Sequence, residues 1–331
     1  MLANQRVELG FVKRPSEGPA MTREIMQVTP LPTFMMNMLQ EEDYIVHDHT
    51  HIIDPGALSK VTALVGTGVS KVDKKLLSML PNVKLIALCS VGYDGIDLVA
   101  AKEKGIVVTH TPGVLTDDVA DLAFGLVLSM GRRIPQADRF VRNGDWVSDL
   151  FPLTHKVSGA TLGIVGMGRI GQAIAKRAVA FDMRISYTSR DVKSELPYTF
   201  HSTVEALAEA VDYLVVAVPG GDDTKNLIGA SVLQALGARG VLINIARGSV
   251  VNQPVLVQAL KDKTIAGAAL DVFWDEPIVD PELRRLPNVV LTPHIASATE
   301  ETRRAMAALT MDNLRAFYAK QALPTPVPEC R

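Results

Sequence analysis

Short hydrophobic runs recur along the first third of the chain and alternate with segments whose hydrophobic residues are spaced as on one helix face. Runs of a length typical of buried strands occupy residues 24–28, 44–46, 61–65, 85–89 and 106–108. Helical spacing occurs at residues 34–39 and 71–80. Because alternating strands and helices form parallel sheets covered by helices, this pattern predicts a first α/β unit.

A second series of hydrophobic runs follows after residue 160. These predicted strands occupy residues 161–165, 184–188, 213–218, 241–246, 266–272 and 289–291. Two long helices flank the series, at residues 116–130 and 299–319. The first is hydrophobic on nearly all sides, so we expect it to be buried between domains or subunits. A chain of 331 residues is too long for one ordinary core, which favours two domains.

The run at residues 161–165 ends in a Gly-x-Gly-x-x-Gly turn that leads into a predicted helix. Gly166 is expected to let the chain reverse, Gly168 to let the backbone approach a pyrophosphate, and Gly171 to let the helix pack closely on the strand. The helix N-terminus favours the negative charge of the phosphates. The turn therefore predicts a dinucleotide site with the cofactor-binding residues Gly166, Gly168, Arg169, Ile170 and Gly171.

The residues after the next predicted strand indicate which dinucleotide is preferred. Enzymes specific for NAD usually carry Asp or Glu about 20 residues beyond the turn, where it binds the ribose 2′-hydroxyl. Here that place holds Ser189 followed by Arg190. Since a hydroxyl and a guanidinium bind a 2′-phosphate that a carboxylate repels, we predict NADP(H) in preference to NAD(H). The alternative is that Arg190 is an ordinary solvated arginine.

Three residues with catalytic chemistry follow predicted strands of the second series: Arg247, Glu276 and His294. In an open α/β sheet, ligands bind at the carboxyl ends of the strands. Arginine binds a carboxylate through two hydrogen bonds, and histidine donates or accepts a proton near neutral pH. A neighbouring glutamate stabilises the imidazolium. Each residue alone is compatible with a structural role, but together they predict a site that reduces a 2-oxo acid.

Composition and charge narrow the remaining function classes. The formal net charge of −2 provides no basic surface for nucleic acid, and no hydrophobic run approaches the roughly 20 residues needed to span a membrane. Residues 1–20 lack a secretory hydrophobic core and are expected to form a loose N-terminal extension. The two cysteines, Cys89 and Cys330, lie far apart in sequence, which suits a reducing, cytoplasmic location.

An alternating histidine cluster lies near the N-terminus. His47, His49 and His51 would share one face of an extended segment, as metal ligands do. No second ligand group is close in sequence, so we favour a solvated polar loop over a zinc site and expect no metal.

Four segments together resemble the D-isomer-specific 2-hydroxyacid dehydrogenases. They are residues 166–171 (GMGRIG), 244–248 (NIARG), 270–277 (LDVFWDEP) and 293–297 (PHIAS). Within that family, the features most similar to the NADPH-dependent glyoxylate/hydroxypyruvate reductases are residues 90–94 (SVGYD), residues 116–121 (TDDVAD) and the Ser189-Arg190 pair. The resemblance implies reduction of glyoxylate to glycolate and of hydroxypyruvate to D-glycerate.

The resemblance also implies roles for individual residues at the substrate. Arg247 would bind the substrate carboxylate and carbonyl, His294 would be the acid/base, and Glu276 would tune it. The backbone N–H groups of Val91 and Gly92 would hold the carboxylate. The predicted catalytic residues are thus Arg247, Glu276 and His294, and the predicted substrate-binding residues are Val91, Gly92, Arg247 and His294.

Further implied roles concern the nicotinamide. Ile245 and Asp271 would line its side of the site, together with Ala296, which stands where many members have glycine. Asn252 replaces an aspartate that is common in the family. Neither departure alters the predicted chemistry.

The family layout implies two doubly wound parallel-sheet domains separated by a cleft. A flavodoxin-like substrate domain would comprise residues 21–117 and 297–331, and a Rossmann cofactor domain residues 118–296. Trp146 resembles a residue that reaches the partner's active site in some members, so a homodimer is expected. Two alternatives remain open: a reductase of bulkier 2-oxo acids such as hydroxyphenylpyruvate, and a cofactor-sensing binding protein.

Overall fold

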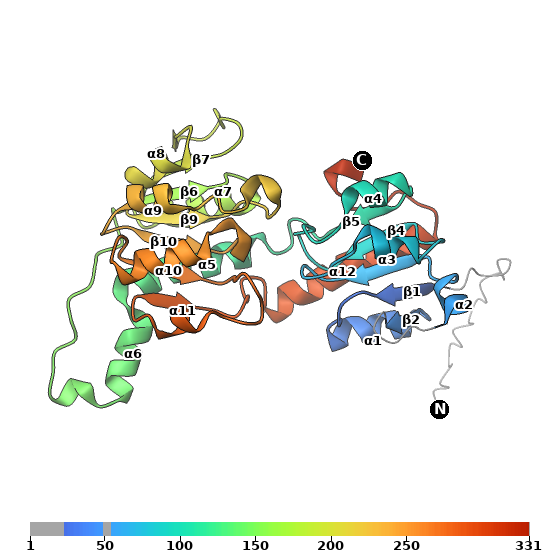
Figure 1. Ribbon diagram of the computed structural model, residues 1–331, viewed down its shortest axis with the longest axis horizontal. Helices are drawn as coiled ribbons and strands as arrows, with labels where there is room; N and C mark the ends of the chain where they lie inside the picture. The colour runs from blue at the N-terminus through green and yellow to red at the C-terminus, as the bar shows by residue number, and fades with distance from the viewer. Residues whose placement is uncertain (1–22, 49–53, 331) are drawn as a thin grey trace, which may run out of the picture.

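The chain folds into two α/β lobes that are joined by two crossing segments. The computed structural model describes residues 23–48 and 54–330, and Figure 1 shows the lobes side by side with helix α12 running from their junction into the first lobe. In the first lobe a five-stranded parallel sheet has the order β2-β1-β3-β4-β5. This is the flavodoxin-like order.

The first lobe contains strands β1 (Glu24–Gln27), β2 (Ile45–Asp48), β3 (Ala63–Gly66), β4 (Leu85–Leu88) and β5 (Val107–Thr109). Its helices are α1 (Thr33–Glu41), α2 (Pro55–Leu58), α3 (Lys74–Ser78), α4 (Leu98–Glu103) and α12 (Glu300–Tyr318), and the short 3-10 helix η4 (Pro328–Cys330) lies near the C-terminus. Helix α12 packs on α1 and β4, although it follows the second lobe in sequence.

The second lobe is built on a seven-stranded parallel sheet in the order β12-β11-β10-β9-β6-β7-β8. Its strands are β6 (Thr161–Val165), β7 (Arg184–Thr188), β8 (Thr199–Phe200), β9 (Tyr213–Val216), β10 (Val241–Asn244), β11 (Gly267–Leu270) and β12 (Val289–Leu291). The strand order reverses between β6 and β9, and the glycine turn follows β6. The turn therefore lies at the switch point where a Rossmann sheet binds its ligand.

Helices cover the second sheet, and one of them projects away from it. They are α5 (Thr116–Arg132), α6 (Ile134–Arg142), α7 (Arg169–Val179), α8 (Val204–Glu209), α9 (Ala230–Leu236), α10 (Gln253–Lys261) and α11 (Pro281–Arg285), with 3-10 turns η1 (Asp145–Val147), η2 (Asp222–Thr224) and η3 (Gly248–Val250). Helix α5 packs on α7, β10, β11 and β12, so it belongs to the second lobe. Helix α6 and the chain after it project from this lobe (Figure 1).

The predicted fold class is confirmed: both sheets are parallel and doubly wound. Strands β3, β4, β9, β10 and β11 are buried along their whole length, as expected for sheets covered on both faces. Several strands were predicted to extend further towards the C-terminus than the observed strands do. Ile245, Ala246 and Val272 are buried, but they lie in the loops beyond β10 and β11, where hydrophobicity continues after the strand stops.

Two local expectations were wrong. Helix α3 begins at Lys74 rather than residue 71, because the Asp73 side chain accepts a hydrogen bond from the Leu76 N–H and caps the helix. His47 does not lie in a solvated loop: it is in β2, and its Nε2 lies 2.9 Å from Glu24 Oε2 on β1. His49 and His51 lie outside the described residues. Within residues 23–48 and 54–330, no three His, Cys, Asp or Glu side chains form a potential metal site.

The two segments that cross between the lobes lie side by side. The Thr302 hydroxyl donates to the Val114 carbonyl at 3.5 Å, and Thr299, which caps α12, donates to Asp118 in the first turn of α5. We retain the predicted domain boundaries, after residues 117 and 296, as a proposal that these contacts support. No helix among the described residues combines the length and hydrophobicity needed to cross a membrane.

We expect the replacement of Gly171 by alanine to destabilise the fold. An added Cβ would lie 2.1 Å from the carbonyl oxygen of Gly166, and such overpacking costs about 1–3 kcal/mol. Gly168→Ala is the matched control, because nothing lies within 4 Å of its added Cβ. Calorimetry should show a melting temperature several degrees lower for Gly171→Ala only. Equal melting temperatures for the two variants would contradict the packing role of Gly171.

Candidate active site

An acid/base pair lies at the carboxyl edge of the second sheet. His294 follows β12 and Glu276 follows β11, and His294 Nδ1 lies 2.6 Å from Glu276 Oε2. The other carboxylate oxygen, Oε1, accepts the Phe273 N–H at 2.9 Å, which fixes the orientation of the carboxylate. The Glu276 and His294 side chains are 22% and 38% exposed, so the histidine is the more accessible member of the pair.

The charge state of Glu276 suits a partner for an imidazolium. Burial disfavours its ionised form, but hydrogen bonds from His294 and Phe273 and the positive charges of His294 and Arg247 outweigh that effect. The pKa of Glu276 is therefore lower than usual, and the carboxylate is ionised at neutral pH. The charge of Arg247 is the smallest of these contributions.

The loop that carries His294 is held by a buried carboxylate. Asp271 has no exposed surface; its Oδ1 accepts from the Thr292 hydroxyl and the Ile295 N–H, and its Oδ2 accepts from the Ala296 N–H, at 2.6–2.9 Å. His294 itself adopts a positive φ of 52°. This geometry positions the His294 loop through Asp271, while a direct contact of Asp271 with the nicotinamide stays a prediction.

Arg247 reaches from the second lobe to the first. Its Nε donates to Asp94 Oδ1 at 3.1 Å, and its Nη1 donates to the Ala246 carbonyl at 2.8 Å. Its Nη2 lies over Gly92, where an added Cβ would approach it to 1.6 Å. Asp94 and Gly92 belong to the loop after β4. The guanidinium is therefore in contact with both walls of the space between the lobes.

The loop after β4 supplies the predicted carboxylate-binding N–H groups. The Ser90 hydroxyl donates to the Gly92 carbonyl at 2.7 Å, and His110 Nδ1 lies 3.0 Å from the Val91 carbonyl. These contacts turn the carbonyls towards the protein. Within the described residues, the N–H groups of Val91 and Gly92 donate no hydrogen bond. The arrangement is compatible with a carboxylate nest beside Arg247.

The glycine turn fits a pyrophosphate. Gly166 has a φ of 101°, which requires glycine, and its N–H donates to the Thr188 carbonyl at the end of β7. Gly168 is the N-cap of α7 and faces open space, so the first N–H groups of the helix are approachable there. Ile170 is half-buried and Arg169 is exposed in the first helical turn. Ile245 and Ala296 are buried near the catalytic loops.

The predicted 2′-phosphate residues lie beside this turn. The Ser189 hydroxyl donates to the Asp191 carbonyl at 2.6 Å, and Arg190 Nη2 lies 3.5 Å from Asp223 Oδ2. The Arg190 and Asp223 side chains are 84% and 88% exposed. Arg190 is thus a solvated surface arginine paired with a solvated carboxylate, and its contact with a 2′-phosphate stays a prediction.

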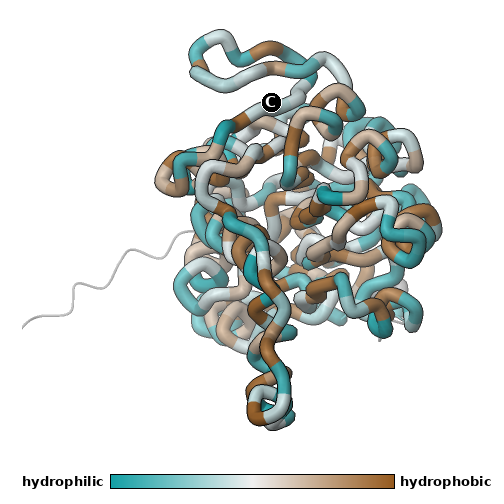
Figure 2. Tube along the Cα trace, turned by 90° about the vertical axis from the view of Figure 1, so that its left-hand side faces the viewer, coloured by the Kyte–Doolittle hydropathy of each residue, from teal (hydrophilic) through white to brown (hydrophobic). Residues whose placement is uncertain are grey.

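Helix α6 and the chain after it form a projecting segment, which carries Trp146. This residue is 67% exposed. Hydrophobic positions recur along this segment (Figure 2). Its exposed hydrophobic side chains are Ile134, Val141, Trp146, Val147, Leu150 and Leu153. Helix α6 was not predicted from the sequence, although its hydrophobic residues are spaced as on one helix face; none of its residues is buried.

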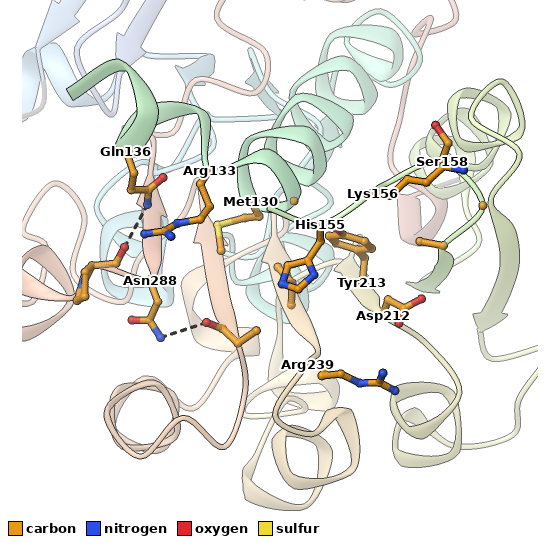
Figure 3. Close-up of a pocket in the computed structure, with 16 residues that line it drawn as sticks. Met130, Arg133, Gln136, His155, Lys156, Ser158, Asp212, Tyr213, Arg239 and Asn288 are labelled. Carbon is orange, nitrogen blue, oxygen red and sulfur yellow. Dashed lines mark hydrogen bonds between the residues drawn. The ribbon is translucent and has the colours of Figure 1, made fainter. Parts of the chain in front are cut away.

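A separate cavity of about 580 Å³ lies at the opposite edge of the second sheet (Figure 3). Its lining residues Asp212, Tyr213, Val241 and Asn288 stand at the amino ends of strands, and none of the predicted site residues lines it. Ligands of open α/β sheets bind at the carboxyl ends instead. We therefore place the active site at the switch point and between the lobes.

Comparisons with known proteins show the family of the chain. Residues 124–296 match the model of the D-isomer specific 2-hydroxyacid dehydrogenase NAD binding domain, so the second lobe is an NAD(P)-binding domain. Glyoxylate/hydroxypyruvate reductase A of Arabidopsis thaliana is 45% identical over 307 residues, which cover 92% of this chain and 98% of the relative. Hydroxyphenylpyruvate reductase of Plectranthus scutellarioides is 44% identical with the same coverage.

A solved structure extends the similarity to the whole fold. The NADPH-dependent glyoxylate/hydroxypyruvate reductase of Sinorhizobium meliloti, in complex with NADP and malonate, superposes with a TM-score of 0.88. It is 42% identical, and the match covers 93% of this chain and 98% of that one. Since the domain match spans more than half of the chain and these relatives match nearly all of it, the protein belongs to the D-isomer-specific 2-hydroxyacid dehydrogenase family.

Proposed function

We propose that the protein is an NADPH-dependent reductase that converts glyoxylate to glycolate and hydroxypyruvate to D-glycerate. The observation that carries this proposal is the hydrogen-bonded His294–Glu276 pair, and the packing of Arg247 against Gly92 supports it. The similar reductases of Arabidopsis thaliana and Sinorhizobium meliloti support the substrate class. Bulkier 2-oxo acids are the second candidate, favoured by the similar hydroxyphenylpyruvate reductase.

The site residues divide the work of the reaction. Arg247 and the N–H groups of Val91 and Gly92 bind the substrate carboxylate and leave the carbonyl beside His294. Glu276 accepts a hydrogen bond from Nδ1–H and stabilises the imidazolium, whose Nε2 proton passes to the carbonyl oxygen and leaves the neutral ring protonated on Nδ1. The glycine turn would hold the dinucleotide, whose nicotinamide would supply a hydride for the carbonyl carbon. Proton and hydride together convert the ketone or aldehyde to the alcohol.

The cofactor and assembly parts of the proposal rest on separate features. Ser189 and Arg190 support NADP(H) over NAD(H), and Ile245, Asp271 and Ala296 are proposed at the nicotinamide side. The exposed hydrophobic residues of the projecting segment, including Trp146, support a homodimer. Sedimentation as a monomer would contradict the dimer. The free thiols Cys89 and Cys330 favour a cytoplasmic location, which cell fractionation tests.

The first test is steady-state turnover of NADPH with a panel of 2-oxo acids. We expect the wild type to reduce glyoxylate and hydroxypyruvate, and His294→Gln to lose about 10²- to 10⁴-fold in kcat/KM because the proton donor is missing. NADPH binding, measured by calorimetry, should be unchanged in the variant. Preference for hydroxyphenylpyruvate would favour the bulkier substrate class, and NADPH binding without any turnover would favour a cofactor-sensing binding protein.

The second test uses the lowered pKa of Glu276. In Glu276→Gln a neutral amide no longer stabilises the imidazolium, so reductase activity should fall away at a lower pH than in the wild type. The same carboxylate stabilises the fold above the glutamate pKa of about 4.3, and this contribution is lost as the pH falls through the lowered value in the folded state. Melting curves of the two proteins should therefore converge in acid; superimposable pH–activity profiles would refute the proposed role.

The third test concerns the cofactor. We expect the wild type to have a higher kcat/KM with NADPH than with NADH, and Arg190→Ala to lose about tenfold or more with NADPH only, because one charged contact to the 2′-phosphate is removed. Asp223→Ala is the matched control, since it removes the partner but keeps the guanidinium. A wild type that prefers NADH, or an equal loss with both cofactors, rules out the assignment.

A further inference from the structure

Asp94 is a charged residue between the lobes to which the proposed reaction assigns no task. It lies in the loop after β4, and its Oδ1 accepts the Arg247 Nε–H at 3.1 Å from the other lobe. The two side chains are 27% and 26% exposed, so the pair is shielded from most of the solvent. Gly220, from the loop after β9, closes the other side: an added Cβ there would lie 3.1 Å from Asp94 Oδ2.

Only some of the N–H donors of the Arg247 guanidinium make hydrogen bonds with described residues. A guanidinium has five N–H donors in a rigid plane. Asp94 takes the one on Nε, and the Ala246 carbonyl takes one on Nη1. Nη2 makes no hydrogen bond within the part of the chain that the structure describes, and it lies against Gly92. The two occupied nitrogens thus fix the plane, and the unoccupied one faces the Val91–Gly92 loop.

We propose that Asp94 is a positioning residue that aims Nη2 of Arg247 at the substrate carboxylate. This inference rests on the proposed function. A long arginine side chain has several rotatable bonds, and a charge-assisted hydrogen bond at Nε removes much of that freedom before substrate arrives. Because Asp94 and Arg247 belong to different lobes, the aimed guanidinium exists only when the lobes are together. Formation of the substrate site is thereby coupled to the approach of the lobes.

If Asp94 acted only through its charge, its removal would have the opposite effect on substrate binding from the one that a positioning role predicts. The negative charge of Asp94 opposes the binding of an anionic substrate, so its removal would tighten substrate binding if charge alone mattered. A positioning role predicts weaker binding, because misplacement of a binding group by about 1 Å costs up to about 100-fold in rate. The direction in which substrate binding changes therefore distinguishes the positioning role from the electrostatic one.

The experiment compares Asp94→Ala, Asp94→Asn and Asp97→Ala in the full chain, with NADPH and glyoxylate. Asp97 lies in the same loop but caps α4 through the Ala100 N–H and does not contact Arg247. We expect Asp94→Ala to raise KM for glyoxylate and lower kcat, with kcat/KM reduced about 10- to 100-fold. The KM for NADPH should not change. Asp94→Asn, whose amide oxygen still accepts from Nε, should stay within a few-fold of the wild type.

The control variants show which results would overturn the positioning role of Asp94. Asp97→Ala should lower the melting temperature and leave the KM for glyoxylate unchanged. Asp94→Ala should instead leave the melting temperature unchanged and raise the KM for glyoxylate. Wild-type kinetics in Asp94→Ala, tighter glyoxylate binding, or an Asp94→Asn variant as impaired as Asp94→Ala would each overturn the positioning role. Absence of glyoxylate and hydroxypyruvate turnover in the wild type would instead refute the proposed function.

Discussion

The geometry of the active site depends on a buried carboxylate. Asp271 has no exposed surface, and a buried carboxyl group is costly unless its oxygens are hydrogen-bonded. One hydroxyl and two backbone N–H groups from residues 292–296 meet this requirement. They do so only while the loop keeps the conformation in which His294 has a positive φ. The cost of burying Asp271 thus enforces the placement of the imidazole, and Glu276 then selects its orientation.

The chemistry is divided between the two lobes. The second lobe holds the imidazole, the carboxylate that stabilises it and the glycine turn, whereas the first lobe holds the loop of Val91 and Gly92. Arg247 belongs to one lobe and touches the other, so neither lobe contains a complete substrate site. Such a division allows substrate to enter while the lobes are apart and excludes water when they meet.

The parts of this arrangement that could be predicted from the sequence share a local signal. The glycine turn is a contiguous motif, and the residues proposed as catalytic each follow a hydrophobic run, so the rule for the carboxyl ends of parallel strands predicts them at one edge of the sheet, where Glu276 and His294 are in contact. Asp94 carried no such signal, because its partner Arg247 lies 153 positions away and the pairing depends on how the lobes meet. His47 was misinterpreted for the same reason: Glu24 on the neighbouring strand is 23 positions away. Helix α6 has helical hydrophobic spacing but no buried residue, so the periodicity was present in the sequence and was overlooked.

Two ion pairs of the same chemistry have different consequences because their surroundings differ. The Arg190–Asp223 pair is almost fully exposed, and exposed pairs contribute only about 0–1 kcal/mol and are screened by salt. A cofactor phosphate can therefore displace Asp223 at little cost. The Arg247–Asp94 pair is about three-quarters buried, so its hydrogen bond is less screened and holds one geometry. Solvent exposure thus leaves the ion pair of Arg190 exchangeable and that of Arg247 fixed, in keeping with the roles proposed for the two arginines.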